Sequence, residues 1–182
     1  MTEPHQHVIF VVALAVTFVA AVLDLRRGEV PNWLTYGALL VAPFLHAARI
    51  VAAHEPMDWA AQEAGFSIGG ALVCVIVPAI LYRQGAIGAG DLKLLAAVGA
   101  LLQTMLGVEA EMYGFFAATL VAPAILAYRG KLFGTLKNAG TILANMFRPK
   151  DKQTSVDEAS LSWFRLGPAV FFGVALTVYL HW

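Results

Sequence analysis

Two aspartates, Asp24 and Asp91, stand where apolar stretches of the chain meet polar loops, and their type and placement suit chemistry. Asp91 follows three glycines within six residues, in the stretch GAIGAGDLKLL, and Asp24 follows an apolar run that begins near residue 8. Charged groups near a bilayer are costly and usually functional. Two carboxylates close together cannot both ionise comfortably, so such a pair shares a proton. The ionised member can take a proton from water while the protonated member donates to a scissile carbonyl.

Six residues near the aspartates are candidate supporting groups: Arg26, Pro31, Asn32, Gly88, Gly90 and Lys93. The glycines permit unusual backbone angles and let a substrate backbone approach closely. The lysine either acts electrostatically on Asp91 or extends to the lipid headgroups, and both interpretations stay open. The arginine either anchors its loop on the basic side of the membrane or orients a carboxylate or a substrate carbonyl. The Pro-Asn pair is expected to start the second helix, with the asparagine as its cap.

Six apolar segments must position these residues: about 8–23, 33–52, 65–82, 92–108, 112–128 and 168–182. The chain of 182 residues is 59% hydrophobic and 13% charged, whereas a soluble domain is nearer a quarter charged. Each segment approaches the ~20 residues with which a helix crosses hydrocarbon. Backbone groups must be paired inside a bilayer. The sequence therefore predicts an all-α, polytopic membrane protein with about six transmembrane helices in a single domain, residues 1–182.

Basic residues gather on one side of this predicted topology, and among Lys and Arg only Arg49 lies on the other. By the positive-inside rule, both termini are predicted to lie outside and the basic loops in the cytoplasm. The longest of these loops is about 129–165. Its apolar residues recur at helical spacing over 132–147, which predicts an amphipathic helix on the cytoplasmic membrane surface. The polar stretch that follows is expected to be a mobile linker.

The orientation leaves few partners for Asp91. Six of the twelve acidic residues fall on the predicted outer side and three in the polar linker, which leaves Asp24, Glu29 and Asp91. Asp24 ends the first helix and Asp91 begins the fourth, so both are expected at one depth near the cytoplasmic face. Glu29 lies in the loop and is the weaker candidate. Taken singly, Asp24 can be a polar helix end and Asp91 an N-cap, but their shared depth favours a catalytic pair.

The stretches around the two aspartates, DLRRGEVPNWLT (24–35) and GAIGAGDLKLLAAVG (85–99), resemble the signature segments of the type IV prepilin peptidases. The resemblance covers all six predicted helices in their order. Presenilin-like proteases also carry GxGD, but the Asp-x-Arg with Pro-Asn seven and eight residues after the Asp separates the two families. The resemblance implies an aspartyl endopeptidase of the bacterial inner membrane, with Asp24 and Asp91 as its catalytic pair. It would remove the short basic leader from prepilin-like precursors at the cytoplasmic face.

Longer members of that family carry an N-terminal cytoplasmic domain with paired CxxC motifs and also methylate the new pilin N-terminus. This chain begins its first predicted helix by residue 8 and has a single cysteine, Cys74. It therefore resembles the short, peptidase-only branch associated with tight-adherence (Flp-type) pili, without a methyltransferase domain. Short members often begin the last helix with a Pro-Tyr-x-Pro-like segment. This chain has RLGP at 165–168, and the sequence assigns no role to it.

Two other classes of function stay open. A proton-coupled transporter or channel would line an ion path with Asp24 and Asp91, although such carboxylates usually lie near mid-bilayer on broken helices. A non-catalytic scaffold for pilus assembly would need neither aspartate. The predicted partners are a prepilin-like membrane substrate and the lipid bilayer, with no nucleic acid and no cofactor. The histidines are scattered towards the outer side and one cysteine excludes a CxxC zinc site, so no metal is predicted. The oligomeric state stays open.

Overall fold

The computed structural model describes residues 4–128, 140–141, 145 and 165–182. Its helices are α1 (Pro4–Arg27), α2 (Asn32–Ala52), α3 (Met57–Cys74), α4 (Ile76–Arg83), α5 (Ala89–Tyr128) and α8 (Gly167–His181). The described ranges contain no strand, and four of their helical stretches are long and apolar enough to cross a membrane. The prediction of an all-α, polytopic membrane protein is confirmed, while the count of six transmembrane helices stays a prediction. Most of the predicted surface helix at 132–147, and the linker after it, lie outside the described residues.

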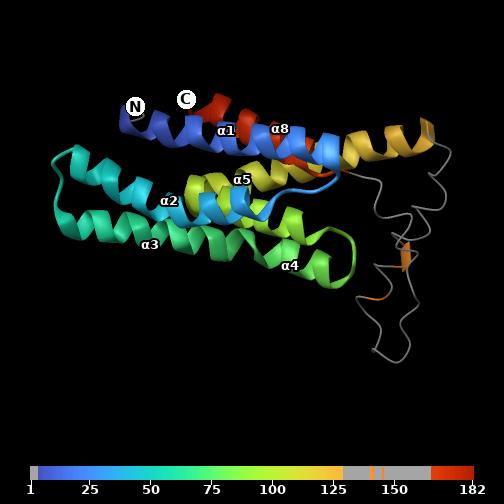
Figure 1. Ribbon diagram of the computed structural model, residues 1–182, viewed down its shortest axis with the longest axis horizontal. Coiled ribbons are helices and arrows are strands. Elements are labelled where there is room, and N and C mark those ends of the chain that lie inside the picture. Colours follow the sequence, from blue (N-terminus) through green and yellow to red (C-terminus); the bar gives the residue numbers. More distant parts are fainter. Residues whose placement is uncertain (1–3, 129–139, 142–144, 146–164) are drawn as a thin grey trace.

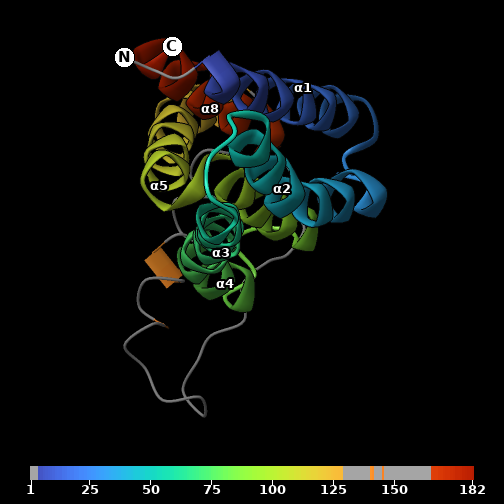
Figure 2. The ribbon, with the colours of Figure 1, turned by 90° about the vertical axis from the view of Figure 1, so that its left-hand side faces the viewer.

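The helices run side by side along the long axis of the molecule (Figure 1). α1 lies against α8, and α2 and α3 form an antiparallel pair. α5 contacts all four of these helices, and the end-on view in Figure 2 shows it between the α1–α8 pair and α3. The N- and C-termini lie together at one end of the bundle. The arrangement makes α5 the central element of the fold.

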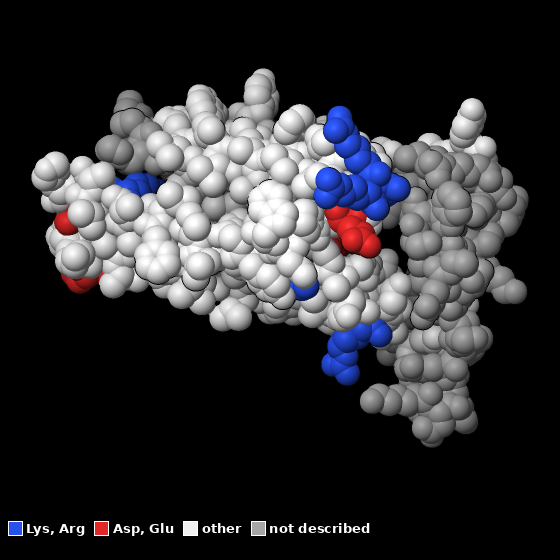
Figure 3. Space-filling model, in the orientation of Figure 1, with Lys and Arg blue, Asp and Glu red and all other residues white. Residues whose placement is uncertain are grey.

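The outer surface of the bundle is apolar along most of its length. Leu40, Phe44 and Leu72 are 69%, 68% and 64% exposed, although large apolar side chains are normally buried in a soluble protein. On the face drawn in Figure 3, charged side chains lie towards the two ends and the surface between them is uncharged. Such a band suits helices surrounded by lipid, where the hydrocarbon core excludes charge.

α5 reverses direction within its length. The backbone of Gln103 leaves helical geometry (φ 60°, ψ −174°). Gly107 then returns so close to Gly99 that a Cβ on Gly107 would lie 2.9 Å from the Cα of Gly99. α5 is therefore a hairpin of a first arm (89–102) and a second arm (104–128). In the first arm Leu94, Leu95, Ala97, Val98, Ala100 and Leu101 are each at most 1% exposed.

This reversal corrects the position of the turn predicted from the sequence. The turn was expected between 108 and 112, with Glu109 and Glu111 in an outer loop. Both glutamates instead lie within the helical second arm, and Glu111 is buried. Apolar residues continue on both sides of Gln103, so hydropathy does not mark the reversal. A single residue with positive φ is enough to turn the chain.

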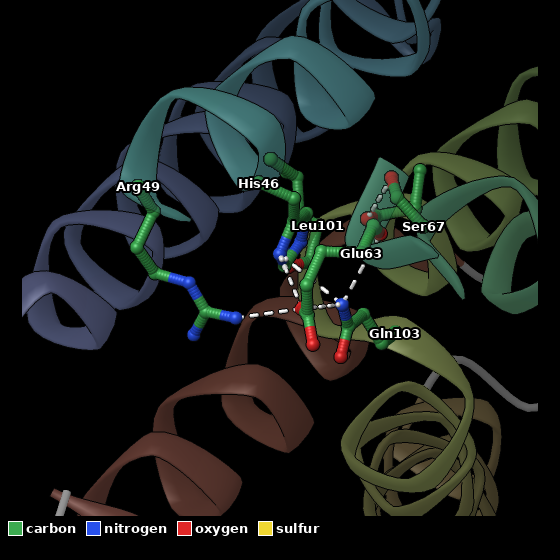
Figure 4. A network of polar contacts seen from close by, with 7 residues as sticks. His46, Arg49, Glu63, Ser67, Leu101 and Gln103 are labelled. Atoms are coloured by element: carbon green, nitrogen blue, oxygen red, sulfur yellow. Dashed lines mark hydrogen bonds and ion pairs between the residues drawn. The ribbon is translucent and has the colours of Figure 1, made fainter. Parts of the chain in front are cut away.

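Polar side chains from α2 and α3 satisfy the carbonyl groups at the end of the first arm (Figure 4). The Ser67 hydroxyl donates to the carbonyl oxygen of Ala100 at 2.7 Å, and His46 Nε2 lies 3.0 Å from that of Leu101. The last carbonyls of a helix have no partner within the helix, and in a bilayer an unpaired group costs several kcal/mol. These contacts allow the first arm to end inside the bundle.

Gln103 itself is held by a carboxylate from α3. Its Nε2 donates to Glu63 Oε2 at 2.7 Å and lies 3.3 Å from His46 Nδ1 (Figure 4). Arg49 Nη2 lies 2.6 Å from the same carboxylate oxygen of Glu63. Arg49 was the one basic residue that the positive-inside pattern left on the outer side, and the ion pair compensates its charge within the bundle.

Candidate active site

Asp24 and Asp91 line one cavity of about 370 Å³. Five of the six predicted supporting residues line it too: Pro31, Asn32, Gly88, Gly90 and Lys93. The sixth, Arg26, lies exposed in the last turn of α1 and does not line the cavity. Glu29 is also at the cavity wall. The two signature stretches, which lie far apart in the sequence, are therefore neighbours in the fold.

Asp24 lies in the last turn of α1 and is 5% exposed. Its carboxylate oxygen Oδ2 accepts a hydrogen bond from the backbone N–H of Gly167 at 2.9 Å. Its backbone carbonyl accepts from Gly28 N–H at 2.8 Å, and also from the guanidinium of Arg165. Gly28 has φ 75°, the left-handed conformation in which glycine commonly ends a helix. The chain thus leaves α1 just after Asp24 and forms the cavity wall.

Asp91 lies in the first turn of α5, and its Oδ2 accepts from the backbone N–H of Gly88 at 3.1 Å. A carboxylate that reaches back to an N–H preceding the helix satisfies one of the unpaired donors of a helix start. Gly90 packs against the backbone of Val30, because a Cβ there would lie 3.5 Å from Val30 N and 3.6 Å from Val30 O. The loop after α1 therefore lies against the start of α5.

Lys93 is paired with α2 rather than with an aspartate. Its Nζ donates to Asn32 Oδ1 at 2.8 Å and lies 5.0 Å from the ring centroid of Tyr36. The prediction that Asn32 caps α2 is wrong: Pro31 precedes the helix without a side-chain cap bond, and Asn32 is the first helical residue. Its side chain reaches across to α5 instead, so Lys93 and Asn32 fix the two helix starts beside the cavity.

A double-mutant cycle tests this link between Lys93 and Asn32. Lys93→Met and Asn32→Ala should each lower the free energy of unfolding by about 1 kcal/mol, as expected for one hydrogen bond. The double variant should lose little more than either single variant, because both remove the same bond. Unfolding would be followed by circular dichroism in detergent. Fully additive losses would show that the two side chains do not stabilise each other.

Sequence reasoning missed Arg165 and Gly167, although both contact Asp24. The signal was the RLGP stretch before the last helix. The structure shows that Gly167 begins α8 and that α8 packs on α1, so this stretch lies at Asp24. Among the described residues, no group of three or more His, Cys, Asp or Glu is arranged to hold a metal ion.

The arrangement is suited to acid–base chemistry at the cavity beside the α1–α2 loop. Two carboxylates from different helices lie at one cavity, and each keeps an oxygen on a backbone N–H donor. Such a donor fixes the orientation of a carboxyl group through one oxygen and leaves the other oxygen available for a different partner. Two carboxyl groups at one cavity are the kind of groups that serve as general acid and general base.

Comparison with known proteins agrees with this geometry. Residues 11–127 match the sequence model of the type IV leader peptidase family. The chain is 32% identical over 148 residues to the prepilin leader peptidase/N-methyltransferase of Bacillus subtilis (strain 168), an alignment that covers 75% of this chain and 54% of that protein. The chain thus spans about half the length of this curated relative. No solved structure matches it. The family match includes Asp24 and Asp91 and ends before Arg165.

Proposed function

Since the chain belongs to the type IV leader peptidase family, we propose that it is an aspartyl endopeptidase of the bacterial inner membrane. In this proposal its residues 1–182 form one peptidase domain that removes the short basic leader from prepilin-like precursors. The observation that carries the proposal is the single cavity lined by Asp24 and Asp91. The rest of the bundle presents an apolar surface that suits a substrate whose own helix lies in the membrane.

In the proposed mechanism the two carboxyl groups share one proton. The ionised group accepts a proton from water as the water attacks the scissile carbonyl, and the protonated group donates to the carbonyl oxygen. A proton then passes to the leaving amine as the peptide bond breaks. Gly88 and Gly167 orient the dyad through their N–H groups. Lys93 and Asn32 hold the cavity wall.

The dyad is proposed to lie near the cytoplasmic face, with both termini outside. Basic loop residues support this orientation, because loops rich in Lys and Arg stay in the cytoplasm. Asp24 is in the last turn of α1 and Asp91 in the first turn of α5, so both belong to the basic end of the bundle. Arg49, the exception, is neutralised by Glu63. A prepilin leader in the cytoplasm would reach the cavity without crossing the bilayer.

We further propose an Flp-type prepilin as the substrate and leader removal without methylation. This part of the proposal follows the resemblance of the sequence to the short, peptidase-only branch of the family, whereas the methylating members carry paired CxxC motifs. The Bacillus subtilis relative is named for both activities, and only the first is proposed for this chain.

The experiment is cleavage of a purified Flp-type prepilin by the full chain in liposomes. We expect a shorter product whose intact mass corresponds to loss of the leader alone, with or without added S-adenosylmethionine. A methylated product would contradict the peptidase-only part of the proposal. An uncleaved substrate, together with a proton or solute flux that requires Asp91, would favour the transporter alternative. Pilus assembly that is independent of cleavage would favour the scaffold.

A further inference from the structure

The segment that begins α8 contacts both the side chain and the main chain of Asp24. Gly167 N–H donates to the carboxylate Oδ2 at 2.9 Å, and the Arg165 guanidinium donates to the backbone carbonyl. Leu166 between them is 5% exposed and belongs to the apolar core. Arg165 therefore contacts the main chain of Asp24, Leu166 anchors the segment in the core, and Gly167 contacts the side chain of Asp24. We call residues 165–167 the α8 strap.

A side chain at position 167 of the α8 strap would crowd Asp24 and the backbone of α1. A Cβ there would lie 2.9 Å from Asp24 Oδ2, 3.0 Å from Asp24 Cβ and 3.3 Å from the Cα of Ala21. The contact with Oδ2 can be relieved if the Asp24 carboxyl group rotates, whereas Asp24 Cβ moves only with the backbone of α1. The third distance involves the backbone of α1, which is packed along α8. A methyl group at 167 therefore displaces Asp24 from its present position.

Arg165 acts on the helix end that carries Asp24. Its guanidinium lies over Gly28, where a Cβ would be 3.5 Å from Nη2. The carbonyl of Asp24 accepts from both Gly28 and Arg165, at a point where terminal carbonyls lack partners within the helix. The arginine thereby fixes the last turn of α1 and the loop that leaves it for the cavity wall.

We propose that Arg165 and Gly167 are positioning residues that hold Asp24 at the working geometry of the dyad, an inference that rests on the proposed function. A carboxyl group in the last turn of a helix has several accessible rotamers and a fraying backbone. The α8 strap restricts both. Neither residue needs to touch the substrate, so the α8 strap contributes to turnover and not to substrate binding.

The test compares kcat and KM for prepilin cleavage in Arg165→Met, Arg165→Lys and Gly167→Ala. Misplacement of a reacting group by about 1 Å can cost about 100-fold in rate. We expect Arg165→Met and Gly167→Ala to lower kcat by about 10-fold to 100-fold with KM nearly unchanged. Arg165→Lys keeps a cationic donor and should recover part of the loss. Arg83→Met, which removes an exposed cation at the end of α4, and Gly65→Ala, at a position with open space, are the matched controls.

Several outcomes would overturn this role of the α8 strap. One is wild-type kcat in folded Arg165→Met and Gly167→Ala, and another is a rise in KM alone. If Arg165→Met fails to fold, an Arg165→Lys variant with no kcat deficit and a Gly167→Ala variant with wild-type kcat would overturn it. Asp24→Asn separates this inference from the proposed function. An inactive Asp24→Asn beside a fully active Arg165→Met removes only the inference, whereas an active Asp24→Asn removes the proposed dyad.

Discussion

Replacing either Asp24 or Asp91 by asparagine should abolish cleavage of a prepilin-like substrate while the protein still accumulates in the membrane. Asparagine keeps the size of aspartate and can still accept from the N–H of Gly167 or Gly88. It cannot take a proton from water or share one with the opposite carboxyl group. Loss of general acid–base catalysis costs about 100-fold to 10,000-fold. Single-turnover cleavage, followed on gels, would measure the residual rate.

Two further carboxylates make this experiment specific. Glu29 lies at the wall of the same cavity but is exposed in the loop. Glu29→Gln therefore tests whether cleavage needs the two aspartates specifically or any carboxylate at the cavity. Asp58, in the first turn of α3, lies outside the cavity and provides the control Asp58→Asn. Full processing by Asp24→Asn or Asp91→Asn would eliminate the aspartyl mechanism. If only Glu29→Gln lost processing, Glu29 rather than the two aspartates would be the catalytic carboxylate.

The location of the two aspartates at one end of the bundle was predictable from the sequence. Hydropathy and loop charge leave only three acidic residues as candidates on that side. The count of charges in loops does not require the detailed path of the helices, and it placed Asp24 and Asp91 at the same end. The loop position of Glu29 and the shared depth of the two aspartates then favoured Asp24 and Asp91, and the family resemblance implied the same pair. Their shared cavity agrees with that prediction and leaves their catalytic role to experiment.

Contacts between distant parts of the chain could not be predicted in the same way. Lys93 lies 61 residues from Asn32, and Gly167 lies 143 residues from Asp24. No local pattern in the sequence records such a pair. Gln103 shows the same limit within one segment, because a reversal made by a single backbone conformation leaves the apolar composition around it unchanged. Hydropathy therefore located the helices and misplaced the break inside the central one.

The central hairpin of α5 also depends on close packing that involves glycine. A Cβ on Gly70 of α3 would lie 2.1 Å from the carbonyl oxygen of Gly99 and 2.8 Å from the Cα of Gln103. These atoms belong to the backbone, so no side-chain rotation can make room. Small residues allow helices to approach closely in membranes, where association relies on packing rather than on the hydrophobic effect. Gly69, one residue earlier in the same helix, has no atom within 4 Å of its would-be Cβ.

Gly70→Ala should therefore unfold or grossly destabilise the protein, whereas Gly69→Ala should not. Overpacking of this kind costs about 3 kcal/mol or more when backbone atoms must move. In contrast, alanine stabilises a helix interior over glycine by about 0.5–1 kcal/mol, so Gly69→Ala should raise the midpoint of thermal unfolding slightly. Circular dichroism and size-exclusion chromatography in detergent would compare the two. Equal midpoints would show that α3 does not press against the α5 hairpin.

The same pair of glycine variants connects packing to activity. The first arm of α5 carries the contact with Gly70 near its end and Asp91 in its first turn. A helix transmits a displacement along its axis, so a methyl group at Gly70 should also shift Asp91. Any Gly70→Ala protein that remains folded is expected to cleave substrate about 100-fold more slowly, the loss that a 1 Å misplacement of a catalytic group produces. Gly69→Ala should cleave at the wild-type rate. A folded Gly70→Ala protein with the wild-type rate would show that the start of α5 is held independently of its far end, by Gly88, Gly90 and Lys93.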